Sequence, residues 1–412
     1  MKILVYEHIT GGGCAGEEIQ PSILSEGYGM LRALILDLKV IRCNIVTFID
    51  SRLKEFSPPL LADDEISISS QSDLHKLLRR YSQEVDGVFI IAPESNQTLQ
   101  CLVEIVEESG GASLNCQVNG IERASNKMEV YKTLDRIGLQ VPETRQIDIH
   151  EDIKEIKHTA CDLGFPLVFK PVVGVGSSGL SVINDESQIA MAVDKMRRET
   201  KCGSSIVQKL IDGVAASVSL ISTGNDALPL TLNRQIVTLS PPFSESRYEG
   251  GVVPLRHKLE EEALRVAQTT VKSLGGLKGY VGVDMVLSSN GPVVIDVNPR
   301  LTTSYVGLRR VVNINPARAI IDAILEQKLP RDVHVSGYAF FLKVRVPAPI
   351  PRALPRIYRL SEVFSPPFPI AGRRESYALI VSHSTTLRGA EMSLHKSRRN
   401  LLEVISRGGC AW

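Results

Sequence analysis

Two short runs decide the fold: Val281-Gly-Val-Asp284-Met-Val-Leu287 and Val293-Val-Ile-Asp296-Val-Asn298-Pro-Arg300. Both are rich in β-branched residues and they flank a polar turn, which predicts an antiparallel hairpin. A two-residue Asn290-Gly291 turn would set apolar side chains against polar ones on both faces. A three-residue loop, with Gly291 in the left-handed conformation, instead gives one apolar face. We therefore expect these pairs: Val283 with Val297, Met285 with Ile295, and Leu287 with Val293.

The other face of this hairpin is polar. It holds Asp284 directly across from Asp296, with Asn298 one step along. Like charges in that arrangement repel unless a positive group lies between them. Carboxylate and amide oxygens without His or Cys suit Mg²⁺ or Mn²⁺, and Mg²⁺ usually completes its shell with substrate phosphates. The pattern predicts a metal site and a phosphate-bearing substrate; the alternative is an outer face that is merely hydrated and acidic.

Size and composition narrow the class of protein. A chain of 412 residues is long enough for two or three domains. The 47 Lys+Arg balance the 46 Asp+Glu, so the overall charge favours neither nucleic acid nor a membrane surface as partner. The seven cysteines are scattered, and no apolar run approaches the ~18 residues of a membrane span. We expect a cytoplasmic protein with small-molecule substrates; a homodimer is one option for its assembly.

Three regions follow one another along the chain. Residues 1–115 alternate strand and helix patterns, which predicts an open parallel α/β domain. Residues 116–330 begin with a helix face and continue as mixed α+β, with strands expected near 167–173, 180–183, 205–211 and 216–221. Residues 331–412 cluster prolines and carry 13 Lys+Arg against 5 Asp+Glu, so we expect a small basic, β-rich unit. The fold class is thus α/β combined with α+β.

A glycine-rich segment, Gly174-Val-Gly176-Ser177-Ser178-Gly179, matches a dinucleotide fingerprint by letter. The β-like run that follows it excludes the helix which that fingerprint requires. The segment is therefore predicted to be a hairpin tip whose backbone N–H groups and hydroxyls hold phosphate oxygens. Lys170 ends the buried strand just before it, and Lys127 opens a helix after Asn126; alone, either lysine is equally well explained as a surface group.

In order along residues 116–325, these pieces resemble the ATP-grasp superfamily. The resemblance implies that Lys127 and Lys170 contact ATP phosphates and that Gln208, Lys209 and Leu210 form the adenine hinge. It also implies that Asp284, Asp296 and Asn298 bind the metal, with two Mg²⁺ or Mn²⁺ ions expected. The family commonly has Glu where Asp296 stands, which shortens that reach by one methylene. An N-terminal pre-ATP-grasp domain would precede this fold.

Such enzymes phosphorylate a carboxylate, and an amine then attacks the acyl phosphate to form an amide. Catalysis is then mainly positioning and electrostatics. Arg300 follows the metal strand directly, so we expect its guanidinium to clamp the carboxylate and acyl phosphate. Arg234 and Arg247 are candidates for a second anionic group of the substrate. The remaining substrate candidates are a mobile loop, Tyr248-Glu249-Gly250-Gly251, and two strand-end carboxylates that could receive an ammonium, Glu7 and Glu94.

A closer resemblance comes from outside the nucleotide site. The chain resembles the tyramine–glutamate ligases of methanofuran and methylofuran biosynthesis in several segments: Glu7-His-Ile-Thr-Gly11-Gly-Gly13, Glu26-Gly27, Met30-Leu31, Ala92-Pro-Glu94-Ser-Asn96, and Tyr248-Glu-Gly250-Gly251. This implies a ligase that joins glutamate to tyramine. A D-alanine–D-alanine type ligase is an alternative, although Val283 stands where that type places an arginine. A regulatory protein that binds ATP without turnover is a second alternative, disfavoured because both lysines and all three metal ligands are present.

Overall fold

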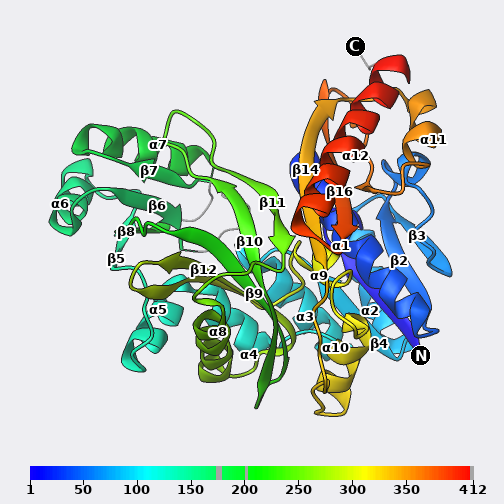
Figure 1. The fold of residues 1–412 in the computed structure, drawn as a ribbon, viewed down its shortest axis with the longest axis horizontal. Coiled ribbons are helices and arrows are strands. Elements are labelled where there is room, and N and C mark those ends of the chain that lie inside the picture. Colours follow the sequence, from blue (N-terminus) through cyan, green and yellow to red (C-terminus); the bar gives the residue numbers. More distant parts are fainter. Residues whose placement is uncertain (173–178, 200–202, 409–412) are drawn as a thin grey trace.

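In the computed structural model the chain forms three β-sheets, and residues 1–172, 179–199 and 203–408 are described. Figure 1 shows a small lobe, built around β5 to β8, on the left and the N-terminal sheet on the right. Strands β9 to β12 lie between them, and the C-terminal helix α12 lies beside the N-terminal sheet. The candidate site residues come from all three sheets.

The first sheet is parallel, with strand order β3-β2-β1-β4. Strands β1, β2 and β4 are largely apolar and buried because helices cover them, as in α/β domains generally, whereas the edge strand β3 is polar and mostly exposed. This confirms the expected open parallel α/β region. The elements are β1 (Lys2–Glu7), α1 (Pro21–Val40), β2 (Asn44–Asp50), β3 (Asp64–Ile68), α2 (Gln71–Glu84), β4 (Gly87–Ile91), and α3 (Thr98–Glu108).

The small lobe is an antiparallel sheet of order β5-β8-β6-β7 that carries two helices and a hydrophobic core of its own. Two helices, α4 (Val118–Ser125) and α5 (Lys127–Arg136), precede it in the chain. The lobe consists of β5 (Thr144–Asp148), α6 (Ile153–Leu163), β6 (Leu167–Pro171), β7 (Ser181–Ile183), α7 (Ile189–Glu199), and β8 (Ser204–Lys209).

The largest sheet has eight strands in the order β13-β12-β9-β10-β11-β14-β16-β15. Its strands are β9 (Val214–Thr223), β10 (Ala227–Thr238), β11 (Arg247–Val253), β12 (Lys278–Ser288), β13 (Gly291–Asn298), β14 (Tyr338–Pro347), β15 (Val363–Ser365), and β16 (Glu375–Ser384). Its helices are α8 (Glu260–Leu274), α9 (Tyr305–Leu308), α10 (Pro316–Leu325), α11 (Leu354–Ile357), and α12 (Leu387–Gly408). Strand β14 pairs with β11, so the sheet continues across the expected boundary at residue 330. The domain boundaries themselves remain predictions.

The hairpin β12–β13 corrects one detail of the expected register. Ser288 pairs with Gly291, so the turn has two residues, Ser289 and Asn290, and the three-residue loop is wrong. A β-bulge then inserts Ile295 as an extra residue, so Met285 pairs with Val294 rather than Ile295. Beyond the bulge the expected register returns. Val283 pairs with Val297, and Asp284 pairs with Asp296, as the patterning of the two faces predicts.

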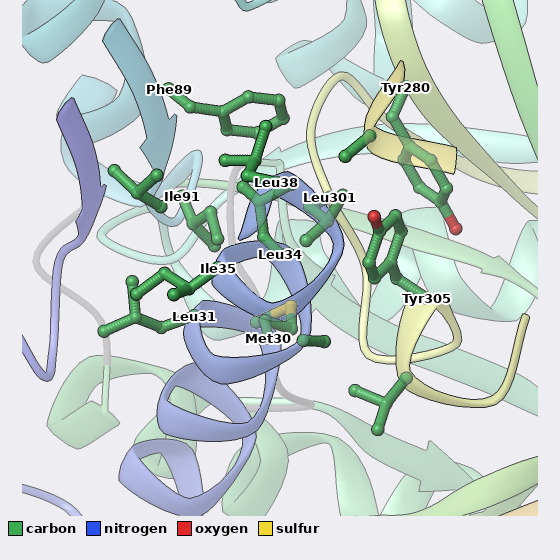
Figure 2. Close-up of a cluster of buried hydrophobic side chains, with 14 of the residues drawn as sticks. Met30, Leu31, Leu34, Ile35, Leu38, Phe89, Ile91, Tyr280, Leu301 and Tyr305 are labelled. Atoms are coloured by element: carbon green, nitrogen blue, oxygen red, sulfur yellow. The ribbon is translucent and has the colours of Figure 1, made fainter. Parts of the chain in front are cut away.

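One hydrophobic core joins the N-terminal sheet to the large sheet. Figure 2 shows the apolar face of α1, including Met30, Leu34 and Leu38, between β4 on one side and Leu301 and Tyr305 on the other. These side chains are at most 7% exposed. Burial of this kind contributes about 25 cal/mol per Å². The N-terminal region and the large sheet are thus one packed body. Within the described ranges, no helix is both long and apolar enough to cross a bilayer.

Candidate active site

The polar face of the β12–β13 hairpin brings two carboxylates and two amides together. Asn298 Nδ2 donates to Asp284 Oδ2 at 3.2 Å, and Gln235 Nε2 of β10 donates to Asp284 Oδ1 at 2.9 Å. Burial, followed by the charge of Asp296, raises the pKa of Asp284 to about 7. The pair is therefore electrostatically unfavourable when both groups are ionised, as the opposing register predicts.

Lys127 compensates part of this negative charge. Its Nζ lies 2.9 Å from Asp296 Oδ2, and its side chain is only 8% exposed. The side chain of Asn126 caps helix α5 by accepting from the N–H groups of Met128 and Glu129. The cap fixes where the helix starts, and so fixes the backbone position of Lys127, its first residue. The sequence predicted a contact between Lys127 and ATP phosphates. The structure brings this lysine to the predicted metal carboxylates.

Lys170 reaches the same site from the small lobe. Its Nζ donates to Tyr131 Oη at 3.2 Å, and Tyr131 in turn donates to the carbonyl of Ile295 at 2.7 Å. That carbonyl belongs to the extra residue of the β-bulge. Burial, followed by the charge of Lys127, lowers the pKa of Lys170 to about 7. A phosphate group would reverse this effect, because an added anion favours the protonated amine.

Arg300 lies beside Glu94 from the N-terminal sheet. Its Nε is 2.9 Å from Glu94 Oε1, but the angle does not give a hydrogen bond, and both Glu94 oxygens are without one among the described residues. Glu94 also lines a small pocket with Lys127, Asp296 and Asn298. Arg300 is thus within electrostatic range of Asp284 and Asp296, and its role as a substrate clamp remains a prediction. Glu94, a predicted ammonium acceptor, already faces a guanidinium.

The donor set fits a hard divalent cation. Asp284, Asp296 and Asn298 supply oxygen atoms on one face, and a cation between the carboxylates would relieve the repulsion that raises the pKa of Asp284. Across the described parts of the chain, no three His, Cys, Asp or Glu side chains converge. Two carboxylates are nevertheless enough for Mg²⁺ when substrate phosphates complete the shell.

The predicted nucleotide cradle is only partly described. Gly174, Gly176, Ser177 and Ser178 lie outside the described residues. The N–H of Gly179 donates to Glu199 Oε2 at 2.7 Å.

The predicted adenine hinge ends strand β8. Gln208 is 3% exposed, and the N–H groups of Lys209 and Leu210 donate to the carbonyls of Glu143 and Pro166. These two N–H groups are thus already bonded within the protein, and the role of the segment as an adenine hinge remains a prediction. It lies on the same lobe as Lys170.

The predicted substrate residues separate into two groups. Glu7 is buried and accepts from the N–H groups of Ile9 and Thr10, while burial raises its pKa. Arg234 and Arg247 are exposed; Arg247 lies 4.0 Å from Glu245, and Arg234 has no ion-pair partner among the described residues. Among the described residues neither arginine forms an ion pair with Asp284 or Asp296, and their role in substrate binding remains a prediction.

The expected mobile loop around Tyr248 is wrong, because residues 247–253 are strand β11 inside the large sheet. Gly250 has φ +138°, and a Cβ there would lie 2.1 Å from the carbonyl oxygen of Phe341 on β14. This glycine therefore permits a close approach of two strands and is no hinge. Tyr248 is half-buried on β11, with the ammonium of Lys343 5.9 Å from its ring centroid.

Sequence reasoning missed two residues of the site, Tyr131 and Gln235. The spacing of Tyr131 from Met128 and Leu134 is typical of an apolar helix face and gives no sign of a role for its hydroxyl. Its hydroxyl is what connects α5 to the bulge. Gln235 carries no sequence signal, because it meets Asp284 only through the pairing of β10, β9 and β12.

Comparisons with known proteins agree with the fold described above. The pre ATP-grasp 3 domain family matches residues 43–121, and the ATP-grasp domain family matches residues 124–304. Tyramine–L-glutamate ligase of Methanocaldococcus jannaschii is 28% identical over 314 residues, which are 74% of this chain and 84% of the relative.

Two solved structures share the fold. An ATP-grasp superfamily protein from Archaeoglobus fulgidus, described as putative, has a TM-score of 0.61 and 25% identity, covering 92% of this chain and 99% of that one. The biotin carboxylase domain of Hydrogenobacter thermophilus 2-oxoglutarate carboxylase, solved with MgADP, ADP and bicarbonate, has a TM-score of 0.71 and 14% identity, covering 96% and 89%. The chain therefore carries a pre-ATP-grasp domain at residues 43–121 and an ATP-grasp domain at residues 124–304, and it is an ATP-dependent carboxylate–amine ligase that resembles tyramine–glutamate ligase.

Proposed function

We propose that the protein joins a carboxylate of glutamate to tyramine at the expense of ATP. The observation that carries this proposal is the convergence of Asp284, Asp296, Asn298 and Arg300 with two buried lysines, in a chain 28% identical to a tyramine–L-glutamate ligase. The substrates follow from that relative. The ligase chemistry follows from the superfamily.

Two half-reactions account for the product. A glutamate carboxylate oxygen attacks the γ-phosphorus, and ADP leaves with the electrons of the broken P–O bond. The amine nitrogen of tyramine then attacks the acyl carbon, phosphate leaves, and the nitrogen loses a proton. Arg300 would hold the two oxygens of the carboxylate and then of the acyl phosphate, which a planar guanidinium can do in a fork.

The two buried lysines would neutralise the phosphates. Lys170 comes from the small lobe and Lys127 from the helix below the hairpin, so a triphosphate between them would contact both lobes. Asp284, Asp296 and Asn298 would hold one or two Mg²⁺ or Mn²⁺ ions, which supply charge neutralisation of the β- and γ-phosphates when bound. The described side chains then serve mainly to orient the reactants and exclude water.

The direct test is to incubate the purified protein with ATP, Mg²⁺, glutamate and a panel of amines, and to identify the amide by mass. We expect glutamyl-tyramine and release of ADP that requires both substrates. ADP release that is indifferent to glutamate and to every amine would contradict the proposed substrates. Amides formed only from other amino acids would favour the broader ligase alternative.

Asp296→Ala distinguishes a ligase from a regulatory ATP-binding protein. In a ligase we expect turnover to fall by about 10²-fold or more, because charge stabilisation of the transferring phosphoryl group is lost. Asp226→Ala is the matched control, since that carboxylate is exposed and pairs with Lys272 away from the site. A wild-type protein that binds ATP but forms no amide with any acceptor would support the regulatory alternative.

A further inference from the structure

An ion pair joins the first helix to the C-terminal strands. Lys343 Nζ of β14 lies 2.5 Å from Glu26 Oε1 of α1, across 317 residues of sequence. The two side chains are 11% and 18% exposed, so they are largely withdrawn from water but still accessible. Both residues lie outside the two family matches, which cover 43–121 and 124–304. Neither has a role in the site described above.

This ion pair lies next to the candidate active site. Glu26 Oε2 accepts from the hydroxyl of Thr303, three residues after Arg300. The ammonium of Lys343 lies 5.9 Å from the ring centroid of Tyr248. Burial, then the charge of Glu26, then that of Asp284, raises the pKa of Tyr248 well above its usual value, so both carboxylates lie close to this tyrosine. Tyr248 is thus near both the ion pair and Asp284.

The charges of the pair match one reactant of the proposed reaction. Tyramine is a cation without an anionic group, so it can use Glu26 but not Lys343. The ATP phosphates can use Lys343 but not Glu26. An α-amino acid carries an ammonium and a carboxylate on one carbon. Of these reactants it alone can offer an ammonium to Glu26 and a carboxylate to Lys343 at the same time. Each buried side-chain charge then keeps a partner of opposite charge when the ion pair opens.

We propose that Glu26, Lys343 and Tyr248 form the subsite for the ammonium and carboxylate of the amino-acid substrate. Glu26 takes the ammonium and Lys343 the carboxylate, while Tyr248 forms the wall toward the metal face. The second carboxylate of glutamate then extends toward Arg300 for activation. This inference rests on the proposed function, and it gives the C-terminal strand β14 a part in substrate recognition.

Three carboxylate substrates test the subsite. They are L-glutamate, glutarate, which lacks the ammonium, and 4-aminobutyrate, which lacks the α-carboxylate. With saturating MgATP and tyramine, we expect Lys343→Met to raise the KM for glutamate by about 10- to 100-fold, the range for one lost charge-assisted hydrogen bond. The preference for glutamate over 4-aminobutyrate should disappear with it. Glu26→Gln should remove the preference over glutarate instead. The KM values for ATP and tyramine should stay unchanged.

A purely structural ion pair predicts a different pattern. The double variant Glu26→Lys with Lys343→Glu would then restore both the melting temperature and the KM, whereas a substrate subsite recovers only the melting temperature. Arg345→Met is the matched control, because Arg345 lies two residues along the same strand and pairs with exposed Glu375. Recovery of the glutamate KM in the double variant, or an equal loss in Arg345→Met, would overturn the proposal.

Failure of the proposed function can be told apart from failure of the subsite. If the wild-type protein forms no glutamyl amide, thermal shift with MgADP and each of the standard L-amino acids decides the question. The subsite predicts that at least one amino acid raises the melting temperature, and that Lys343→Met abolishes the rise while Arg345→Met keeps it. If no amino acid stabilises the wild-type protein, the subsite is wrong as well.

Discussion

The site holds ionisable side chains, Asp284 and Lys170, whose charged forms are disfavoured by burial. Asp284 and Lys170 both have a pKa of about 7, reached from opposite directions because desolvation disfavours the charged form of each. Binding of a cation would lower the pKa of Asp284, and binding of a phosphate would raise that of Lys170. Ligand binding at this site is therefore coupled to proton transfer.

The lowered pKa of Lys170 predicts that nucleotide binding takes up a proton and does not release one. At pH 8 the free lysine is largely neutral, since its pKa is lowered to about 7. The phosphates of a bound nucleotide should return that pKa toward the usual value of about 10.4, so binding should take up close to one proton. Calorimetric titration of the protein with MgADP, in buffers of different ionisation enthalpy, measures this number. Release of a proton, or none exchanged, would contradict the assignment.

Lys170→Met should abolish the proton uptake, and Lys195→Met is the matched control. Lys195 is also buried, but its ammonium donates to the backbone carbonyls of Leu180 and Ser244, whereas that of Lys170 donates to Tyr131.

The lowered pKa of Lys170 also affects the stability of the fold. Between about pH 7 and pH 10.4 the unfolded chain binds more protons at Lys170 than the folded chain does. The contribution of Lys170 to the free energy of unfolding therefore rises with pH across that window.

At the scale of elements, the hairpin shows what sequence patterning can and cannot predict. The alternation of apolar and acidic residues predicted Asp284 opposite Asp296, because only that register leaves one face apolar. It did not predict that Ile295 forms a bulge, because a two-residue turn with a bulge and a three-residue turn without one give the same pairing at the carboxylates. The carbonyl that the bulge presents to Tyr131 could not be foreseen for the same reason.

Strand β11 shows a glycine whose role depends on a distant strand. Gly250→Ala should destabilise the protein by more than about 3 kcal/mol, because a Cβ would lie 2.1 Å from the Phe341 carbonyl and φ is +138°. Gly138→Ala is the control: its φ is +76° with nothing within 4 Å, so only about 1 kcal/mol is expected. Urea unfolding measures both. A hinge role for Gly250 would instead leave stability nearly unchanged and lower turnover.

At the scale of the whole molecule, the C-terminal residues complete the large sheet instead of standing apart. The change in composition near residue 330 suggested a separate unit, but β14 pairs with β11 and α12 covers β14 and β16 (Figure 1). Proline spacing and net charge carry no information on pairing between strands about ninety residues apart. Helix α1 is tied to helix α9, which packs on β14, since Asp37 accepts from Tyr305 and pairs with Arg309.

The small lobe is the exception to this continuity, because its main core is separate from those of the other two sheets, although Val172 and Ile206 pack into the core under the large sheet. We therefore expect β6 and β8 to exchange amide hydrogens faster than β9 and β12 in the free protein. MgATP should slow that exchange, because Lys170 belongs to the lobe and Asp296 to the large sheet, so one ligand would connect them. Exchange followed by mass spectrometry tests this, with β1 to β4 as the internal reference. Asp296→Asn should keep the exchange pattern of the free protein and lose the protection, whereas protection retained in that variant would mean that the nucleotide binds to the lobe alone.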